Sequence, residues 1–395
     1  MKLTDEQQRV LNGSDGEVRQ KMLRLLVQLG RLYDASELVP VKSVQVAGVS
    51  YKSISEPGLT FLEDFARKGA YVSVPTYTNP AGIDVVAWRE IGFPEAFAGK
   101  QLRILRAFEA MGAALSLTCT PYLAGNTPGF GDHIAWSESS AVCFANSVLG
   151  ARTNREGGPS ALAAAICGVT PNYGLHQDEN RYPEVIIEVD TELRNTTDFG
   201  TLGYFVGKEV QHRVPYLRGV PEADTEQLKM MGAAMAASGS LSLFHVENVT
   251  PEAGLVPTEG RPVVKVSKTD LDQTRASLNR GKRDVDIIML GCPHASIKEL
   301  HMVSECLKGR RLKRPLWICT SRAVRTLAVD AGLVRGIEAA GGKVLADTCA
   351  VVAPIEEMGI HTSGVNSGKC AHYLPGLCKQ DVVYRSMEEL IEEQT

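Results

Sequence analysis

The chain has 395 residues, of which 44% are hydrophobic and 22% charged, and its formal net charge is −4 at pH 7. This is the composition of a globular protein that can bury a large core in two or three domains. Acidic and basic residues are mixed along the chain without a basic arm or stripe, so we expect no nucleic-acid partner.

The N-terminal segment MKLTDEQQRVLNG is polar and lacks the apolar core of a secretory signal. No apolar run approaches the roughly 18 residues of a membrane-spanning helix. We therefore expect a cytoplasmic protein with no membrane association. The nine cysteines are an odd number and form no CxxC pair, which argues against a disulfide framework, a zinc ribbon or a thioredoxin-like site.

Apolar periodicity predicts alternating helices and short strands in residues 1–182, which we take as an α/β region. The expected helices are 4–12, 17–35, 58–68, 101–111, 136–149 and 160–168, and the expected strands are 42–48, 70–74 and 113–118. Residues 183–265 are less patterned and are a possible inserted subdomain. Strands are expected there at 185–189 and 241–246, and a helix at 224–238.

Residues 266–395 show a clearer alternation and form a second predicted α/β region. Helices are expected at 268–278, 295–307, 321–328 and 332–340, strands at 285–290, 315–319 and 342–347, and a surface helix near the C-terminus. Strands that alternate with helices predict mostly parallel sheets flanked by helices.

Three cysteines directly follow predicted strands: Cys119 after ALSLT, Cys292 after DVDIIMLG and Cys349 after KVLADT. Open α/β sheets bind ligands beyond the carboxyl ends of their strands. Three thiols at such an edge could hold an iron–sulfur cluster and leave one iron open to substrate. The alternative for any cysteine is a small buried hydrophobe. We assign that role to Cys143, Cys167, Cys306 and Cys319.

Several polar motifs are candidates for substrate binding, each with a purely structural alternative. The GVS turn at 48–50 could bind a carboxylate or phosphate through its backbone N–H groups, or could be a plain turn. Asn79 could bind a ligand or start a turn. Glu138 could act as acid, base or orienting group, or it could serve with an N-cap at Ser137 to begin the following helix. Lys369, in NSGKCAHY, could pair with a substrate carboxylate or be solvated.

Basic residues and histidines give weaker signals. Arg152 and Arg155 could bind an anion or rim the surface. His133, His176 and His294 are weak metal-ligand candidates by themselves. No GxGxxG or Walker spacing occurs in the glycine-rich segment GNTPGFGDH, so a nucleotide site is unsupported.

Several long strings closely resemble the large subunit of the aconitase X family, a branch of the aconitase superfamily of iron–sulfur hydro-lyases. They are GVSYKSISEPGLTFLEDFARKGAYVSVPTYTNPAGID, TCTPYLAGNTPGFGDHIAWSESSAVCFANSVLGARTNREGGPSALAAAICG, GCPHASIKEL, DTCAVVAPIEEMG and NSGKCAHYLPG. The resemblance extends over nearly the whole chain. It implies an aconitase-like multidomain α/β architecture with an iron–sulfur site at a domain interface.

The resemblance also implies site residues. The cluster, [2Fe–2S] or [4Fe–4S], would be held by Cys119, Cys292 and Cys349. The implied substrate residues are Gly48, Val49, Ser50, Asn79, Pro80, Glu138, Ser139 and Lys369, and Glu138, Ser139 and Lys369 are also the expected catalytic residues. A small subunit of the swivelling-domain type, expected as a separate chain, would contribute a catalytic serine.

Two activities are associated with the family, and both act on a small carboxylate. One removes water from cis-3-hydroxy-L-proline to give 1-pyrroline-2-carboxylate. The other converts (R)-5-phosphomevalonate to trans-anhydromevalonate 5-phosphate. The alanine-rich composition lacks the Lys/Glu enrichment of hyperthermophile proteins, which leads us to expect the hydroxyproline reaction.

Three functions of other classes stay open at the level of sequence. An iron–sulfur redox protein would need a fourth thiol near the other three, and Cys370 is the candidate. A non-catalytic binding subunit would use the anion-binding turns alone. A metal-free enzyme would depend on Glu138 and Lys369.

Overall fold

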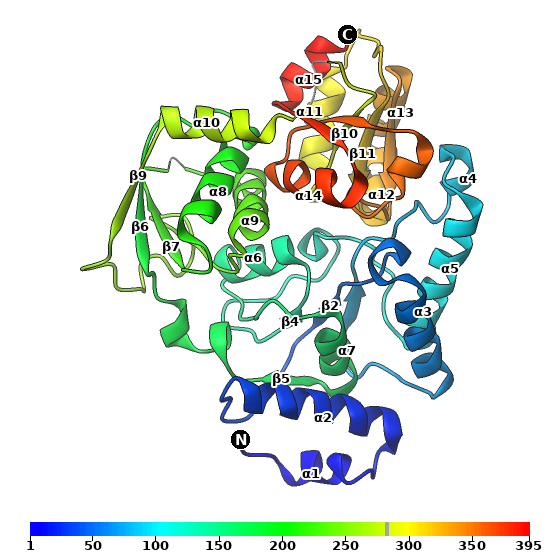
Figure 1. The fold of residues 1–395 in the computed structure, drawn as a ribbon, viewed down its shortest axis with the longest axis vertical. Helices are drawn as coiled ribbons and strands as arrows, with labels where there is room; N and C mark the ends of the chain where they lie inside the picture. The colour runs from blue at the N-terminus through cyan, green and yellow to red at the C-terminus, as the bar shows by residue number, and fades with distance from the viewer. Residues whose placement is uncertain (221, 281–283) are drawn as a thin grey trace.

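Parallel β-sheets organise the chain, shown in the computed structural model that describes residues 1–220, 222–280 and 284–395. The N-terminal lobe, the green second lobe and the yellow-to-red C-terminal lobe lie around a common centre (Figure 1). The termini lie at opposite ends of the molecule. Within the described ranges, three of the four sheets are wholly parallel, which confirms the predicted α/β class with mostly parallel sheets.

The first lobe contains a three-stranded parallel sheet in the order β3-β2-β4. Its strands are β2 (Val44–Val46), β3 (Thr76–Thr78) and β4 (Ala135–Trp136). A separate antiparallel pair joins β1 (Leu38–Pro40) to β5 (Val169–Pro171). The helices of this lobe are α1 (Asp5–Leu11), α2 (Gly16–Leu32), α3 (Tyr51–Arg67), α4 (Trp88–Ile91), α5 (Glu95–Ala110), α6 (Ser139–Ser147) and α7 (Gly158–Cys167). Short 3₁₀ turns lie at Pro121–Leu123, Gly174–His176 and Asp178–Arg181.

The second lobe is a four-stranded parallel sheet in the order β8-β7-β6-β9, covered by two long helices. The strands are β6 (Val185–Asp190), β7 (Pro215–Arg218), β8 (His245–Val246) and β9 (Val263–Ser267). The helices are α8 (Thr196–Val210) and α9 (Thr225–Gly239). Helix α9 packs against α8 on one side and against α6 and α14 of the neighbouring lobes on the other.

The third lobe is a five-stranded parallel sheet in the order β12-β11-β10-β13-β14. The strands are β10 (Ile287–Leu290), β11 (Leu316–Thr320), β12 (Gly342–Ala346), β13 (Thr362–Val365) and β14 (Asp381–Tyr384). The helices are α11 (Ile297–Cys306), α12 (Arg322–Asp330), α13 (Leu333–Ala339), α14 (Gly368–Cys378) and α15 (Met387–Glu393), with a 3₁₀ turn at Ile355–Met358. Helix α10 (Lys268–Leu278) precedes this lobe in the chain and packs mainly on α8 of the second lobe (Figure 1). All residues of the central strands β10 and β11 are buried, as expected for a parallel sheet with helices on both faces.

Three sequence-based expectations about elements are wrong. Residues 113–118 form no strand: Ala114 and Thr118 bond to β3, but a positive φ of 44° at Leu117 breaks the ladder between them. Residues 70–74 are also not a strand, because their backbone groups bond to Met111 and Ala165 at helix ends. The polar segment NSGKCAHY was interpreted as a loop that contains Cys370, but most of it belongs to helix α14, which is capped by the Ser367 hydroxyl.

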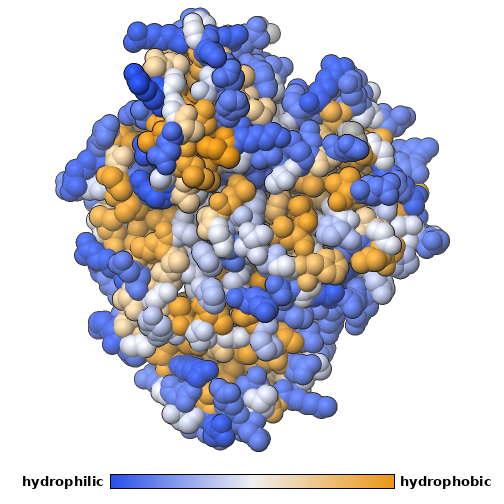
Figure 2. All heavy atoms as spheres, turned by 180° about the vertical axis from the view of Figure 1, so that it is seen from behind, coloured by the Kyte–Doolittle hydropathy of each residue, from blue (hydrophilic) through white to orange (hydrophobic). Residues whose placement is uncertain are grey.

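No helix in the described ranges is long and apolar enough to cross a membrane. Figure 2 shows polar residues spread over one whole face of the molecule, with apolar patches between them.

Helices α8 and α9 approach closely because glycines lie at their contact. A Cβ added to Gly203 would overlap the Met231 carbonyl oxygen, and one added to Gly207 would overlap Ser238. Residues four apart share one helix face, so these two glycines form a single groove that receives α9. The second lobe therefore depends on the absence of side chains at these positions.

We expect Gly203→Ala to lower the free energy of unfolding by about 1–3 kcal/mol, because the added methyl group meets backbone that cannot move away cheaply. The matched control is Gly99→Ala, at an exposed position of α5, where an added Cβ meets nothing within 4 Å. There the better helix propensity of alanine should raise stability by about 0.5–1 kcal/mol. Chemical denaturation measures both, and a Gly203→Ala protein as stable as wild type would contradict the close-contact interpretation.

Candidate active site

Two parallel sheets direct the carboxyl ends of their strands at one cavity. On the first-lobe side, the loops after β2, β3 and β4 begin at Ala47, Asn79 and Ser137. On the third-lobe side, the loops after β10 and β12 carry Cys292 and Cys349, and Lys369 lies in the first turn of α14, which follows β13. The cavity between them has a volume of ≈ 240 Å³ and is lined by Ala47, Gly48, Ser53, Asn79, Pro80, Cys119, Ser137, Glu138, Ser139, Arg155, Cys292, Cys349, Val351, Val352, Lys369, Tyr373 and Leu377. Ligands bind at this edge in open α/β sheets.

All three predicted cluster cysteines, Cys119, Cys292 and Cys349, line this cavity, and all three are buried. Burial raises the pKa of the Cys119 thiol to about 12, and the Cys119 sulfur accepts a hydrogen bond from the backbone N–H of His294 at 3.2 Å. The thiols of Cys292 and Cys349 lie close enough to interact with each other. Cys370 also lies close to Cys292, but it does not line the cavity.

The donor set fits an iron–sulfur cluster better than a single ion. Among the described residues, no group of three or more His, Cys, Asp or Glu side chains converges on one metal position. A cluster contains several irons, so its thiolates bind at different points and need not converge. Thiols are also the soft ligands that iron–sulfur clusters take. The assignment of the three cysteines as ligands stays a prediction that this lining supports.

Glu138 and Lys369 form a buried ion pair at the wall of the cavity. The Lys369 ammonium donates to Glu138 Oε1 and also to Ser140 Oγ at 3.0 Å. Asn79 Nδ2 donates to the other carboxylate oxygen of Glu138 at 2.8 Å. The structure thus brings together Asn79 and Lys369, which are 290 residues apart in the sequence.

The charges in this pair stabilise each other. Burial alone would raise the pKa of Glu138, but the Lys369 ammonium and the hydrogen bonds from Lys369 and Asn79 lower it to about 2. Burial alone would lower the pKa of Lys369, and the Glu138 carboxylate raises it well above its ordinary value. At neutral pH the wall therefore holds a carboxylate and an ammonium.

The helix-capping interpretation of the SES segment is wrong for Ser137, whereas Glu138 does lie at the N-terminus of the following helix. The N-cap of α6 is Glu138, not Ser137, and no side chain caps this helix end. The Glu138 side chain turns instead to Lys369 and Asn79. Ser139 lies beside it, and its hydroxyl is 3.4 Å from Glu138 Oε1. The Glu138 carboxylate therefore lies in the cavity lining and makes no capping hydrogen bond to α6.

Sequence reasoning missed Gln45, which organises this wall from strand β2. Its side chain is fully buried, donates to the Thr118 carbonyl oxygen at 3.1 Å and accepts from the Glu138 backbone N–H at 3.2 Å. The signal was present as a lone polar residue inside the apolar strand VQV, because a buried amide must find partners.

Only the first residue of the GVS turn lines the cavity. Gly48 lines the cavity with a φ of +80°, a backbone conformation that favours glycine. Val49 and Ser50 do not line it. Ser50 caps α3 and donates to the Val352 carbonyl oxygen at 2.9 Å, which links the first lobe to the loop after Cys349. A role for Val49 and Ser50 in substrate binding stays a prediction.

Arg155 is an exposed cation in the lining of the same cavity. Within the described residues its side chain has no ion pair and no hydrogen bond. Arg152, three residues before it, is instead paired with Asp178 and lies outside the cavity. Of the two arginines in this segment, Arg155 is the one available to an anionic ligand.

Three histidines were weak metal candidates, and none lines the cavity. His133 and His176 contact each other through Nδ1 at 2.9 Å. His294 is fully buried, and both of its ring nitrogens already have partners within the protein. Burial lowers the pKa of His294 to about 4, so its ring is neutral at pH 7.

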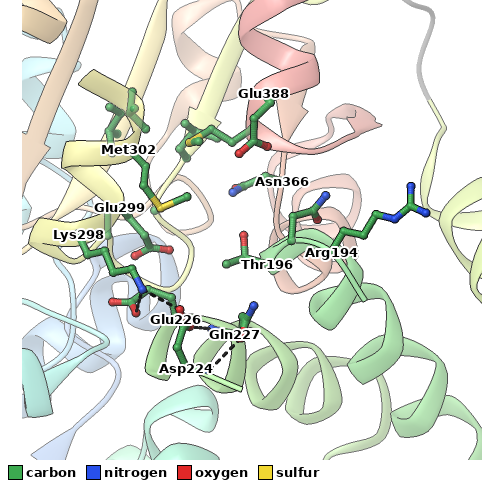
Figure 3. A pocket seen from close by; sticks show the side chains of 17 residues that line it. Arg194, Thr196, Asp224, Glu226, Gln227, Lys298, Glu299, Met302, Asn366 and Glu388 are labelled. Atoms are coloured by element: carbon green, nitrogen blue, oxygen red, sulfur yellow. Dashed lines mark hydrogen bonds and ion pairs between the residues drawn. The ribbon is translucent and has the colours of Figure 1, made fainter. Parts of the chain in front are cut away.

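A second cavity of ≈ 240 Å³ lies between the second and third lobes (Figure 3). It contains none of the predicted site residues. Its acidic side chains are largely paired: Lys298 contacts Asp224 at 2.7 Å, and Glu299 pairs with Lys229. We therefore place the candidate active site in the cysteine-lined cavity.

Comparison with known proteins agrees with this geometry. Models of the aconitase X first, second and third domains match residues 1–179, 183–276 and 285–395. A phosphomevalonate dehydratase large subunit from Methanocaldococcus jannaschii is 47% identical over 99% of this chain and 100% of its own. A cis-3-hydroxy-L-proline dehydratase from Pseudomonas aeruginosa is 35% identical over 98% of this chain and 68% of its own.

A crystal structure of Thermococcus kodakaraensis aconitase X in its holo form has the same fold, with a TM-score of 0.95, 47% identity and full coverage of both chains. The three domain models together account for nearly every residue, and the relatives by name are dehydratases. The chain therefore belongs to the aconitase X family of hydro-lyases.

Proposed function

We propose that this chain is the large subunit of a phosphomevalonate dehydratase. The observation that carries the proposal is the 47% identity, over the full length of both chains, to a large subunit of that name. Identity to the hydroxyproline dehydratase is lower, at 35%. The relatives thus favour the phosphomevalonate reaction over the hydroxyproline reaction that the alanine-rich composition suggested.

The charges in the cavity support the same choice. Phosphomevalonate carries a carboxylate at one end and a phosphate at the other, whereas hydroxyproline has a single acid group. The cavity lining holds two cations: Lys369, which is paired with Glu138, and Arg155, which lies in its exposed part. Guanidinium groups bind phosphate oxygens in bidentate geometry, so we assign the phosphate to Arg155 and the carboxylate end to the region of Lys369 and Gly48.

The reaction removes a proton from the carbon beside the carboxylate and a hydroxyl from the next carbon, and forms a carbon–carbon double bond and water. In this proposal Cys119, Cys292 and Cys349 hold an iron–sulfur cluster. When bound, a cluster with a position free of cysteine supplies a Lewis acid for the hydroxyl group. Because Cys370 lies outside the lining, three thiols face the cavity and a fourth thiol ligand is not supported.

The chain's own residues then bind and orient the substrate. The pKa of Glu138 is held near 2, so it is a carboxylate in the resting site and not a ready proton donor. Its part is to orient Lys369 and Asn79, and Lys369 supplies the ammonium that faces the departing oxygen or the acid group. Ser139 adds a hydroxyl beside Glu138.

The base that removes the carbon-bound proton is assigned to a partner. The relatives are named large subunits, which supports a separate small subunit for this chain as well. We propose that this subunit is of the swivelling-domain type and brings a catalytic serine to the cavity. The large chain alone would then be inactive.

We expect Arg155→Ala to raise the KM for phosphomevalonate by about 10–100-fold, because a charged hydrogen bond to phosphate is worth about 1.5–3 kcal/mol. The matched control is Arg152→Ala, which removes a nearby arginine outside the cavity and should leave KM unchanged. Steady-state kinetics of the two-subunit complex on phosphomevalonate and on cis-3-hydroxy-L-proline tests this. Turnover of hydroxyproline alone, or an unchanged KM in Arg155→Ala, would refute the substrate assignment.

We expect Lys369→Met to lower kcat by about 10²–10⁴-fold, since it removes a positioned ammonium from the site. The variant should keep wild-type iron and sulfide content, because Lys369 is not a proposed ligand. Lys298→Met, which breaks an ion pair at the second cavity, is the control and should retain kcat. Loss of iron together with activity in Lys369→Met, or full activity without the ammonium, would show that its assigned role is wrong.

A further inference from the structure

We propose that His294 is a positioning residue that holds the three cysteine-bearing segments in register. It follows Cys292 by two residues on the loop after β10. Its ring contacts Thr118 and Thr348, the residues directly before Cys119 and Cys349. One fully buried side chain thus contacts both other segments that carry a candidate ligand. The inference rests on the proposed iron–sulfur site.

The directions of the hydrogen bonds fix a single arrangement of the ring. His294 Nε2 lies 2.8 Å from the Thr348 carbonyl oxygen, which can only accept, so Nε2 carries the hydrogen. In the neutral ring Nδ1 is then the acceptor, and the Thr118 hydroxyl donates to it at 2.9 Å. The Thr118 oxygen itself accepts from the Thr120 backbone N–H at 3.1 Å. Each of these hydrogen bonds therefore joins one donor to one acceptor.

A third contact comes from the backbone of the same residue. The His294 N–H donates to the Cys119 sulfur at 3.2 Å. Hydrogen bonds of this kind orient a thiolate ligand and tune its basicity. His294 therefore reaches the Cys119 segment twice, through its ring at Thr118 and through its N–H at the sulfur.

The loop that carries His294 is anchored independently of the ring. The buried Lys229 ammonium of α9 donates to the His294 carbonyl oxygen at 3.2 Å. The next residue, Ala295, bonds to β11 through its N–H and carbonyl oxygen. Removal of the imidazole therefore leaves this loop in place, while the segments of Thr118 and Thr348 lose their shared partner. We therefore expect removal of the imidazole to change the distance between Cys119 and Cys349.

The test compares His294→Leu with His245→Leu. Both histidines are fully buried, and each has Nε2 at 2.8 Å from a backbone carbonyl oxygen, that of Thr348 or of Arg181. His245 lies in β8 and does not line the cavity that contains Cys119, Cys292 and Cys349. The full-length chains, in complex with the small subunit if it copurifies, are prepared without oxygen and reconstituted with iron and sulfide. Iron and labile sulfide per chain, the visible absorption spectrum and the melting temperature are measured.

We expect both variants to melt cooperatively at similar temperatures. His245→Leu should carry wild-type iron and sulfide, and His294→Leu should bind the cluster about 10–100-fold more weakly, the usual cost of losing an outer partner of a ligand. Wild-type loading and an unchanged spectrum in His294→Leu would overturn the inference alone. A wild-type chain that binds neither iron nor sulfide would overturn the proposed cluster site and the inference with it.

If His294→Leu does not fold, Thr118→Val tests the same contact and leaves His294 intact. Its control is Thr201→Val in α8, which removes an equally buried hydroxyl. The Thr201 hydroxyl lies 3.1 Å from the Tyr384 hydroxyl. We expect Thr118→Val to lower the iron and sulfide content or shift the cluster absorption, and Thr201→Val to do neither. A Thr118→Val protein with wild-type content and spectrum would overturn the inference.

Discussion

The candidate site depends on holding the carboxyl edges of two separate parallel sheets against each other. Each sheet alone supplies half of the chemistry: the first lobe brings Asn79, Glu138 and Cys119, and the third brings Lys369 and the other two cysteines. Hydrogen bonds and ion pairs between loops join the halves. The Ala81 N–H donates to the Asp347 carbonyl oxygen at 2.8 Å, and the Arg322 side chain bridges the carboxylates of Asp84 and Asp347 just before Cys349. Asp84 belongs to the first lobe, whereas Arg322 and Asp347 belong to the third. The cavity therefore exists only when the two lobes are packed together.

Burial gives this edge its electrostatic character. Glu138 and Lys369 stay charged because each compensates the other, and breaking such a buried pair from one side costs about 3–5 kcal/mol. The pair joins the two halves of the site directly, since one partner follows β4 and the other begins α14. The same low-dielectric surroundings raise the pKa of the Cys119 thiol, so binding to iron would have to displace its proton. The site thus combines a stable ion pair with thiols that keep their protons until a metal binds.

The sequence was sufficient for the fold class, because the alternation of strands and helices predicts parallel sheets. Strand-end positions suggested Cys119, Cys292 and Cys349, and the family resemblance implied Asn79, Glu138 and Lys369; all six line the cavity. The sequence was not sufficient where contacts between distant segments determine the local structure or the partner of a side chain. The segment before Cys119 has the composition of a strand, yet the positive φ at Leu117 turns it away from the ladder. The α14 segment contains Pro375 and several polar residues, and its helix is stabilised by packing on α8 and α9. Gln45 and His294 bind partners that are 73 and 176 residues away, respectively, and no local pattern predicts such pairs.

The most direct measurement is the iron and labile sulfide content of four single variants, Cys119→Ala, Cys292→Ala, Cys349→Ala and Cys370→Ala, each purified without oxygen with its small subunit and assayed for dehydratase activity. Cys370 lies beside Cys292 but outside the cavity lining, which makes it the matched control. The three-thiol site predicts that each of the first three variants loses cluster and activity while Cys370→Ala keeps both. A cluster retained without one of the three lining cysteines, or lost with Cys370, would contradict it.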